Sequence, residues 1–253
     1  MKIRMIVTDL DNTLLRRDKT ISNHTVDVFR CCRERGMLLA YATARDFRFV
    51  TDHIVSLTGF EPDVIIADNG AFAQYRGKDV YKRMIPYKTI NTLISRFDLV
   101  RCVSTESAYY LSGDYSNDHW SIGKKATVII DFSNNIEQDA FYIDGDISIS
   151  PMLLTEGCSD IRAVVYSDVN LVTVVHREAT KLNALTAMVN FLNIDKSNIA
   201  VFGDDYSDIE ILSNYDCSIA VANAIDDCKA AAKYLCGDCD EDGVAKWLEE
   251  NVL

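Results

Sequence analysis

Five short apolar runs, placed toward both ends of the chain, constrain the fold of this 253-residue sequence most strongly. They are MIVTD (5–9), MLLAYAT (37–43), DVIIAD (63–68), NIAVFGD (198–204) and CSIAVAN (217–223). None shows the polar alternation of a half-exposed strand, so each is typical of a strand buried on both faces in a parallel sheet. Helical segments lie between them, and this alternation predicts a doubly wound, Rossmann-like α/β core.

Two of the intervening segments carry a clear helical pattern. Ser22 is placed to cap the first helix and Gly36 to end it, and its apolar face consists of Val26, Phe29 and Cys32. In the second, one helical face holds Leu182, Leu185, Met188, Val189 and Leu192. Each helix leads into the next buried run, which completes a strand–helix–strand unit.

The pattern changes in the middle of the chain. The runs ATVIIDF, AFYIDGDISIS, IRAVVYS and NLVTVVH are typical of strands in an antiparallel α+β arrangement rather than another βαβ repeat. We therefore expect a core formed by residues 1–83 and 178–253 and an inserted domain at 84–177. The chain is expected to leave the core after its third strand and to return to complete it. The hinges are expected in YKRMIPYK, where Pro86 restrains the backbone, and in HREATK.

A formal net charge of -12 argues against binding to nucleic acid or to an anionic membrane, because both require basic patches. No apolar run reaches transmembrane length and the N-terminus lacks a secretory pattern, so a cytoplasmic location is expected. The eight cysteines are expected to be reduced. Cys236 and Cys239 have CxxC spacing, but a zinc site needs two further ligands, which favours a surface loop. The oligomeric state stays open.

Polar residues end several predicted strands, at the sheet edge where α/β proteins bind ligands. They are Asp9, Asp11, Thr43, Asp68, Asn69 and Asp204. Aspartates also end strands and cap helices for structural reasons, so Asp9 and Asp11 alone are weak evidence of a site. Asp204, Asp205 and Asp208 form a second acidic group at a strand-to-helix turn. Carboxylates brought together there repel one another unless a cation is present, and oxygen ligands suit Mg²⁺.

Lys181 opens the second predicted helix, where the helix dipole disfavours a cation. One interpretation is an exposed lysine whose stem packs on the helix. The alternative is a lysine that pairs with Asp9 and holds an anion, with Thr43 adding a hydroxyl donor and Arg45 a charged fork.

Taken in order, these pieces resemble the four motifs of the haloacid dehalogenase superfamily of phosphohydrolases. The matching residues are DLDNT, Thr43 in TAR, Lys181 and GDDYSD. The segments IADNGA, AVANAIDDCKAAAKY and DEDGVAKWLE are similar to Cof-type members of subclass IIB, whose inserted domain is a C2 cap. The insertion here falls between the second and third motifs, as it does in that subclass.

This resemblance implies a Mg²⁺-dependent phosphatase that hydrolyses a small phosphate monoester, such as a sugar phosphate or related metabolite. Asp9 would be the nucleophile that forms an aspartyl-phosphate, Asp11 the general acid and base, and Lys181 the third catalytic residue. The implied metal ligands are Asp9, the Asp11 carbonyl and Asp204, with Asp208 in support. The implied substrate-binding residues are Thr43, Ala44, Arg45, Asn69, Lys181 and Ser207.

Four positions depart from the pattern of the family. Asn12, Ala44 and Leu182 replace frequent glycines, and Ser207 replaces a frequent asparagine. Three other functions stay open. A phosphosugar mutase of the same superfamily would use the same core, a signalling receiver domain also phosphorylates an aspartate, and a non-catalytic protein could bind a phosphate ligand. The inserted domain and the paired aspartates argue against the receiver domain.

Overall fold

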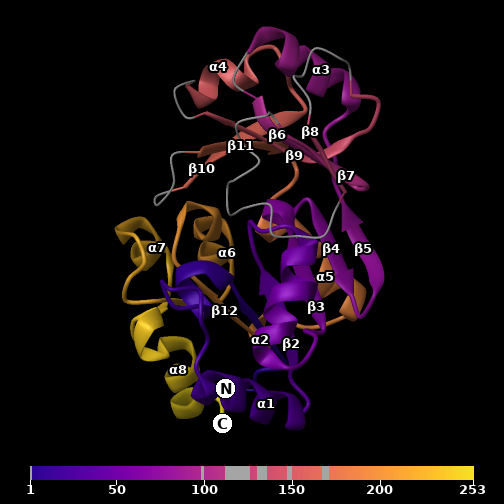
Figure 1. Cartoon of the computed structure of the whole chain (residues 1–253). Helices are drawn as coiled ribbons and strands as arrows, with labels where there is room; N and C mark the ends of the chain where they lie inside the picture. Colours follow the sequence, from indigo (N-terminus) through magenta and orange to yellow (C-terminus); the bar gives the residue numbers. More distant parts are fainter. Residues whose placement is uncertain (1, 98–99, 112–125, 130–135, 147–149, 167–170) are drawn as a thin grey trace. The chain divides into compact units, whose positions relative to one another are not determined.

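A computed structural model describes residues 2–97, 100–111, 126–129, 136–146, 150–166 and 171–253 of the chain (Figure 1). The chain divides into two compact units. Unit 1 consists of Met1–Tyr81 and Lys181–Leu253, and unit 2 of Lys82–Thr180. The domain limits expected from the sequence, 84 and 177, lie two and three residues inside unit 2. Unit 2 is thus an insertion between the two segments of unit 1.

Unit 1 is built on a sheet with the strand order β14-β13-β12-β1-β2-β3-β4-β5. The five buried runs form its centre, and neighbouring strands among them pair in parallel, which confirms the predicted doubly wound core. The strands are β1 (Met5–Thr8), β2 (Leu38–Ala42), β3 (Val64–Ala67), β4 (Phe72–Tyr75), β5 (Lys78–Lys82), β12 (Ile199–Gly203), β13 (Cys217–Ala220) and β14 (Tyr234–Leu235).

The β4 and β5 strands correct one sequence-based expectation. The chain was expected to leave the core after its third strand, but it first adds β4, which pairs antiparallel with β3, and then β5. All of β5 and half of β4 are only partly buried or exposed, so neither has the wholly apolar run by which the central strands were identified. The sheet of unit 1 is therefore parallel with an antiparallel edge.

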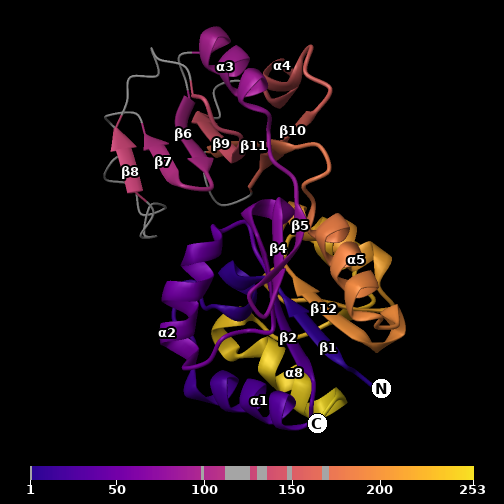
Figure 2. The ribbon, with the colours of Figure 1, turned by 90° about the vertical axis from the view of Figure 1, so that its right-hand side faces the viewer.

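The helices of unit 1 cover both faces of the sheet. Figure 2 shows α1, α2 and α8 on one face and α5 on the other. Ser22 accepts a hydrogen bond from the Thr25 amide at the start of α1, and Gly36 has φ 81° after its end, as predicted. The helices are α1 (Asn23–Glu34), α2 (Val55–Thr58), α5 (Lys181–Leu192), α6 (Ile209–Asn214), α7 (Asp226–Ala231) and α8 (Gly243–Asn251). In the described part of the chain, no helix has the length and apolar character needed to span a membrane.

Unit 2 contains a second sheet, with the order β10-β11-β9-β6-β7-β8. Its strands are β6 (Val100–Thr105), β7 (Ala108–Leu111), β8 (Ala126–Ile129), β9 (Ala140–Asp146), β10 (Ile161–Val165) and β11 (Leu171–His176). Pairing is antiparallel except between β7 and β8, which are parallel, so the expected antiparallel sheet is in fact mixed. Residues 130–132, 147–149, 167 and 170 of the predicted strands lie outside the described residues.

Two helices pack on one face of this second sheet, α3 (Tyr87–Arg96) and α4 (Pro151–Thr155) (Figure 1). The apolar core between helices and sheet includes Leu93, Val103, Ile143, Leu154 and Val174. Removing such side chains from water stabilises the fold by roughly 2 kcal/mol each. Unit 2 therefore has a hydrophobic core of its own.

Asp144 on β9 is a buried carboxyl group in unit 2. Its side chain is 6% exposed and accepts a hydrogen bond of 2.6 Å from the Thr173 hydroxyl on β11. Burial raises the pKa of Asp144 from 3.8 to about 7, although the Thr173 hydrogen bond lowers it in part. Between pH 3.8 and about 7, the folded protein consequently binds more protons at Asp144 than the unfolded chain does.

We expect the stability of the protein to fall as pH rises through this window, because the folded-state pKa lies above the unfolded one. The loss is roughly 1.4 kcal/mol for each pH unit. Asp144→Asn removes this contribution, so the variant should gain stability relative to the parent protein from pH 3.8 to about 7. Urea unfolding at a series of pH values measures the difference. A difference that does not change across the window would contradict the assignment.

Candidate active site

Asp9 lies directly after β1, at the carboxyl end of the central strands of unit 1. Its amide donates to the Phe202 carbonyl on β12, which ties the start of the following loop to the sheet. The residue is 7% exposed, and its carboxylate accepts a hydrogen bond of 2.7 Å from the Lys181 ammonium. The predicted pairing of Asp9 with Lys181 is therefore present.

Lys181 is the first residue of α5 and has an exposed fraction of 2%. Its Nζ contacts Asp9 Oδ1 and Asp208 Oδ1, both at 2.7 Å. Burial alone lowers the pKa of a lysine, but the negative charges of Asp208 and Asp9 outweigh it and raise the pKa of Lys181. The interpretation of Lys181 as an exposed surface lysine is wrong, because the ammonium is buried between two carboxylates.

Asp208 and Asp204 occupy the turn after β12, as predicted. Asp208 Oδ2 accepts hydrogen bonds from the amides of Asp204 and Asp205, at 3.1 and 3.2 Å. Asp204 Oδ1 accepts a hydrogen bond of 2.5 Å from the Thr13 hydroxyl. The turn therefore aims one oxygen of Asp208 at backbone amides and the other at Lys181.

Because Gly203 has no side chain, the Asp208 side chain can pack directly against its backbone. A Cβ atom at position 203 would be 2.5 Å from Asp208 Cβ and 2.6 Å from its Cγ. We expect Gly203→Ala to displace the Asp208 side chain and to destabilise the protein by about 1–3 kcal/mol, as overpacking does in other cores. Urea unfolding would measure the loss. An alanine variant as stable as the parent would show that the turn accommodates the methyl group.

Asp9, Asp204 and Asp208 form a buried acidic cluster in which oxygen atoms from all three lie within 4.8 Å of one another. Burial is the largest cause that raises the pKa of Asp9 to about 7 and of Asp204 to about 9. Repulsion adds to the rise, from Asp208 on both residues and from Asp9 on Asp204, whereas Lys181 lowers it. Three carboxylates in so small a volume fit a hard divalent cation such as Mg²⁺, which would offset their repulsion.

Asp11 faces a different set of partners. Its carboxylate accepts two hydrogen bonds from Arg45, at 2.8 and 3.0 Å, and lies 2.9 Å from the Lys19 ammonium. Burial raises the pKa of Asp11, but the hydrogen bonds and charges of Arg45, and then of Lys19, outweigh it and lower the pKa to about 2. In the described part of the chain the Asp11 carboxylate is outside the acidic cluster. The predicted contribution of Asp11 to a metal site is its carbonyl, not this carboxylate.

The second motif lies beside Asp11. The buried Thr43 hydroxyl accepts a hydrogen bond from the Arg45 amide, and the Asn69 amide donates to the Thr43 carbonyl at 3.2 Å. The Arg45 guanidinium lies over the Phe49 ring, 4.6 Å from its centroid. Ala44 is the half-buried residue between Thr43 and Arg45. Arg45, predicted as a substrate ligand, is thus an ion-pair partner of Asp11 in this structure.

The fourth motif places its predicted substrate ligand in a short turn. Ser207 is half-buried in the 3-10 turn Tyr206–Asp208, between an exposed tyrosine and the buried Asp208. The turn begins with a capping box between Asp205 and Asp208. Asp205 therefore acts as a helix cap, which gives a structural reason for one carboxylate of the second acidic group.

Two polar residues of the site were not singled out from the sequence. Lys19 belongs to the basic run LRRDK, which carried no motif. Asn223 donates a hydrogen bond of 2.6 Å to the Asn12 carbonyl and accepts one of 2.9 Å from the Cys239 amide. Asn12 has φ 57°, a backbone conformation that asparagine adopts more readily than most residues. The side chain at position 12 therefore fits the turn that glycine would otherwise make.

The CxxC pair lies in a loop of unit 1 near the C-terminus. Cys239 falls in an acidic group with Asp238 and Asp240, but both acids pair with Arg17. Cys236 is not part of that group, and both cysteines are free thiols. Among the described residues no metal-binding group contains both cysteines, and Cys239 is buried, with 2% exposure, so the surface-loop interpretation does not describe its side chain.

Comparison with known proteins identifies the family. The profile of the haloacid dehalogenase-like hydrolases matches residues 6–248, which is most of the chain. The chain belongs to the haloacid dehalogenase-like hydrolases. The superfamily membership predicted from the four motifs is confirmed, and this hydrolase is an enzyme whose fold class is the one expected from its sequence.

Individual relatives of this hydrolase cover nearly its full length. The 5-amino-6-(5-phospho-D-ribitylamino)uracil phosphatase YitU of Bacillus subtilis is 23% identical over 97% of this chain and 96% of its own. The structure of SMU.1108c from Streptococcus mutans UA159 superposes with a TM-score of 0.86 at 20% identity, over 98% of both chains. The subclass IIB sugar phosphatase BT4131 superposes with a TM-score of 0.81 at 19% identity, again over 98% of both.

Proposed function

We propose that this hydrolase is a Mg²⁺-dependent phosphatase that acts on a small phosphate monoester through an aspartyl-phosphate on Asp9. The observation that carries the proposal is the buried cluster of Asp9, Asp204 and Asp208, held together with Lys181. A cluster of carboxylates with one buried ammonium is suited to bind a divalent cation and a phosphate group together. Asp9, Asp204 and the Asp11 carbonyl would hold the ion, with Asp208 in support.

In this proposal Asp9, Asp11 and Lys181 each have a separate role in the reaction. Asp9 attacks phosphorus, and the leaving oxygen takes a proton from Asp11. Arg45 and Lys19 hold Asp11 ionised in this structure, so it must be protonated before this step. Asp11 then removes a proton from the water that hydrolyses the aspartyl-phosphate. Bound Mg²⁺ supplies positive charge that offsets the negative charge of the transferring group. Lys181 orients Asp9 and neutralises part of the same charge.

The phosphate group itself needs donors beside Asp9. The second motif offers the Thr43 hydroxyl and the Ala44 amide at the edge of the sheet, and Arg45 adds a guanidinium that already lies at the site. Asn69 and Ser207 lie in the neighbouring turns. We assign these residues to phosphate binding together with Lys181.

We infer that the substrate is a sugar phosphate or a related metabolite. Support comes from the relatives, since YitU bears the name of a phosphatase of a phosphorylated ribitylamino compound and BT4131 that of a sugar phosphatase. We assign unit 2 the role of a C2-type cap that selects the leaving group, because it is inserted between the second and third motifs. A cytoplasmic location stays a prediction.

A panel of phosphate esters, including sugar phosphates and an aryl phosphate, tests the function through release of inorganic phosphate. We expect turnover with Mg²⁺ and its loss after chelation with EDTA. A phosphosugar mutase would instead convert a hexose 1-phosphate into an isomer without phosphate release. A protein that binds phosphate esters but turns none over, with its folding intact, would contradict the proposal and favour a non-catalytic role.

A further inference from the structure

The two oxygens of the Asp11 carboxylate are not equivalent in their contacts. Oδ1 accepts from Arg45 Nη2 at 3.0 Å and contacts Lys19 Nζ at 2.9 Å. Oδ2 accepts from Arg45 Nε at 2.8 Å. A carboxylate oxygen has two lone pairs to offer to donors. Among the described residues, Oδ1 therefore has a donor for each lone pair, whereas Oδ2 has one donor and one lone pair left.

Arg45 alone would not create this difference. Its fork engages both oxygens symmetrically, one nitrogen to each, which fixes the plane of the carboxylate but not the oxygen that reacts. The second donor on Oδ1 comes from Lys19. The asymmetry of the carboxylate thus depends on the lysine.

We propose that Lys19 is a positioning residue that occupies Oδ1 of Asp11 and so makes Oδ2 the oxygen that carries the proton in the reaction. The inference rests on the proposed function, in which Asp11 serves as general acid and base. Lys19 acts through Asp11 and need not touch the substrate. It extends the site by a residue from a segment outside the four motifs.

The loop that carries Lys19 is built to hold the ammonium in place. A tight turn is closed by hydrogen bonds from the Arg16 amide to Thr20 and from the Lys19 amide to Arg16, at 3.0 and 2.8 Å. Lys19 itself has φ 66°, which is uncommon for a residue with a Cβ atom. Such a backbone conformation costs free energy and persists where surrounding contacts enforce it.

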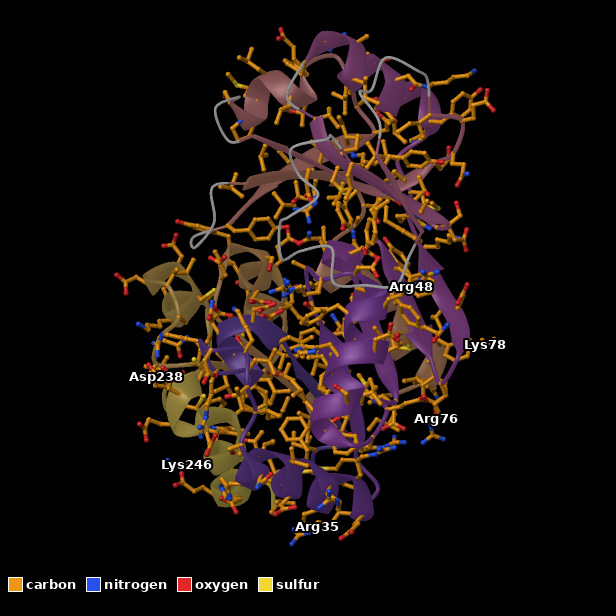
Figure 3. The ribbon with its side chains drawn as sticks, viewed as in Figure 1. Arg35, Arg48, Arg76, Lys78, Asp238 and Lys246 are labelled. Atoms are coloured by element: carbon orange, nitrogen blue, oxygen red, sulfur yellow. The ribbon has the colours of Figure 1, made fainter. Side chains whose placement is uncertain are left out.

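Those contacts come from the C-terminal segment of unit 1. Arg16 pairs with Asp242 at 3.0 Å. Arg17 pairs with Asp238, at the surface position labelled in Figure 3, and with Asp240. Of the three basic residues of LRRDK, Arg16 and Arg17 therefore hold the loop against the C-terminal segment, and Lys19 contacts Asp11.

The proton path follows from this arrangement. Asp11 is ionised beside Arg45 and Lys19 in this structure, so Oδ2 must first take up a proton from solvent. In the first step an oxygen of Asp9 bonds to phosphorus, the bond from phosphorus to the ester oxygen breaks with its electron pair on that oxygen, and Asp11 Oδ2 gives that proton to it. In the second step a water oxygen bonds to phosphorus and its proton goes to Asp11 Oδ2. The bond from phosphorus to Asp9 breaks, which restores the free carboxylate and releases inorganic phosphate.

The alternative is an ordinary surface ion pair. The Lys19 side chain is 38% exposed, and exposed pairs contribute about 0–1 kcal/mol to stability with no effect on chemistry. The two interpretations differ in their dependence on the leaving group. An alkoxide needs a proton as it leaves, whereas 4-nitrophenolate leaves without one, so only the positioning role makes the loss depend on the ester.

Lys19→Met tests the proposal, because methionine keeps an unbranched side chain and carries a similar backbone cost at positive φ. We expect kcat/KM, which reports the transfer to Asp9, to fall about tenfold for glycerol phosphate and less than about threefold for 4-nitrophenyl phosphate. Lys19→Arg should recover part of the loss. The control is Arg30→Met, which removes an exposed ion pair with Asp27 on α1. It should leave both values unchanged.

Equal losses for the two esters, or no loss in Lys19→Met, would overturn the positioning role. This result is distinct from failure of the proposed function, in which the parent protein would hydrolyse neither ester. Thermal unfolding of each variant establishes that the comparison is made between folded proteins.

Discussion

Asp9→Asn should reduce phosphate release by on the order of 10⁴-fold or more, because the amide cannot form the aspartyl-phosphate. The substitution keeps the shape of the side chain and an oxygen that can accept from Lys181, which lies 2.7 Å from Asp9. It also removes one charge from a cluster in which burial and repulsion raise the pKa of Asp9 to about 7. We therefore expect the variant to fold with stability at least equal to that of the parent.

Steady-state kinetics and urea unfolding of the same preparation separate these two effects. Asp27→Asn, on the exposed surface of α1, is the matched control and should be active. An Asp9→Asn protein that keeps a tenth or more of the parent activity would exclude Asp9 as the nucleophile. Inactivity combined with unfolding would contradict the view that the charge at this position opposes stability.

Lys181→Met should reduce both the stability and the activity of the protein. The ammonium is buried between Asp9 and Asp208, and its loss leaves two buried carboxylates without their cation. Removal of one partner from a buried ion pair typically destabilises a protein by about 3–5 kcal/mol. Activity should fall as well, because Asp9 loses the contact that orients it.

Lys246→Met, at an exposed position of α8 that is labelled in Figure 3, is the control for the loss of a lysine. A second variant, Lys181→Met with Asp208→Asn, tests the cause. Because it removes one of the uncompensated charges, it should recover part of the stability lost in Lys181→Met. If the double variant is less stable by the full sum of the single changes, the two residues are not coupled as the contacts indicate.

The elements of the core that could be predicted from the sequence are those with strong local patterns. The runs that became β1, β2 and β12 are almost wholly apolar and hold no charged residue, and such runs indicate strands buried on both faces. By contrast, β5 is exposed or half-buried along its length, so it lacks the apolar signal. The parallel pairing of β7 and β8 depends on the direction in which the second strand runs beside the first, which the apolar pattern of each strand does not report.

The candidate site shows the same division. Asp9 and Asp208 follow two strands that end at one edge of the sheet, and Lys181 meets them there at the start of α5. The partners of Asp11 could not be found in that way, because Lys19 reaches it only through a tight turn with positive φ. Asn223, more than 200 residues from Asn12 in the chain, likewise reaches that turn only through the tertiary fold.

The measurement that tests the central claim most directly is detection of the aspartyl-phosphate. The parent protein is mixed with a substrate and Mg²⁺, quenched in acid within the first turnover, digested, and examined by mass spectrometry of the peptide that contains Asp9. We predict a phosphorylated Asp9 in the parent protein and none in Asp9→Asn. Turnover of the substrate with phosphate on another residue, or with no phosphorylated residue under any quench time, would contradict the account.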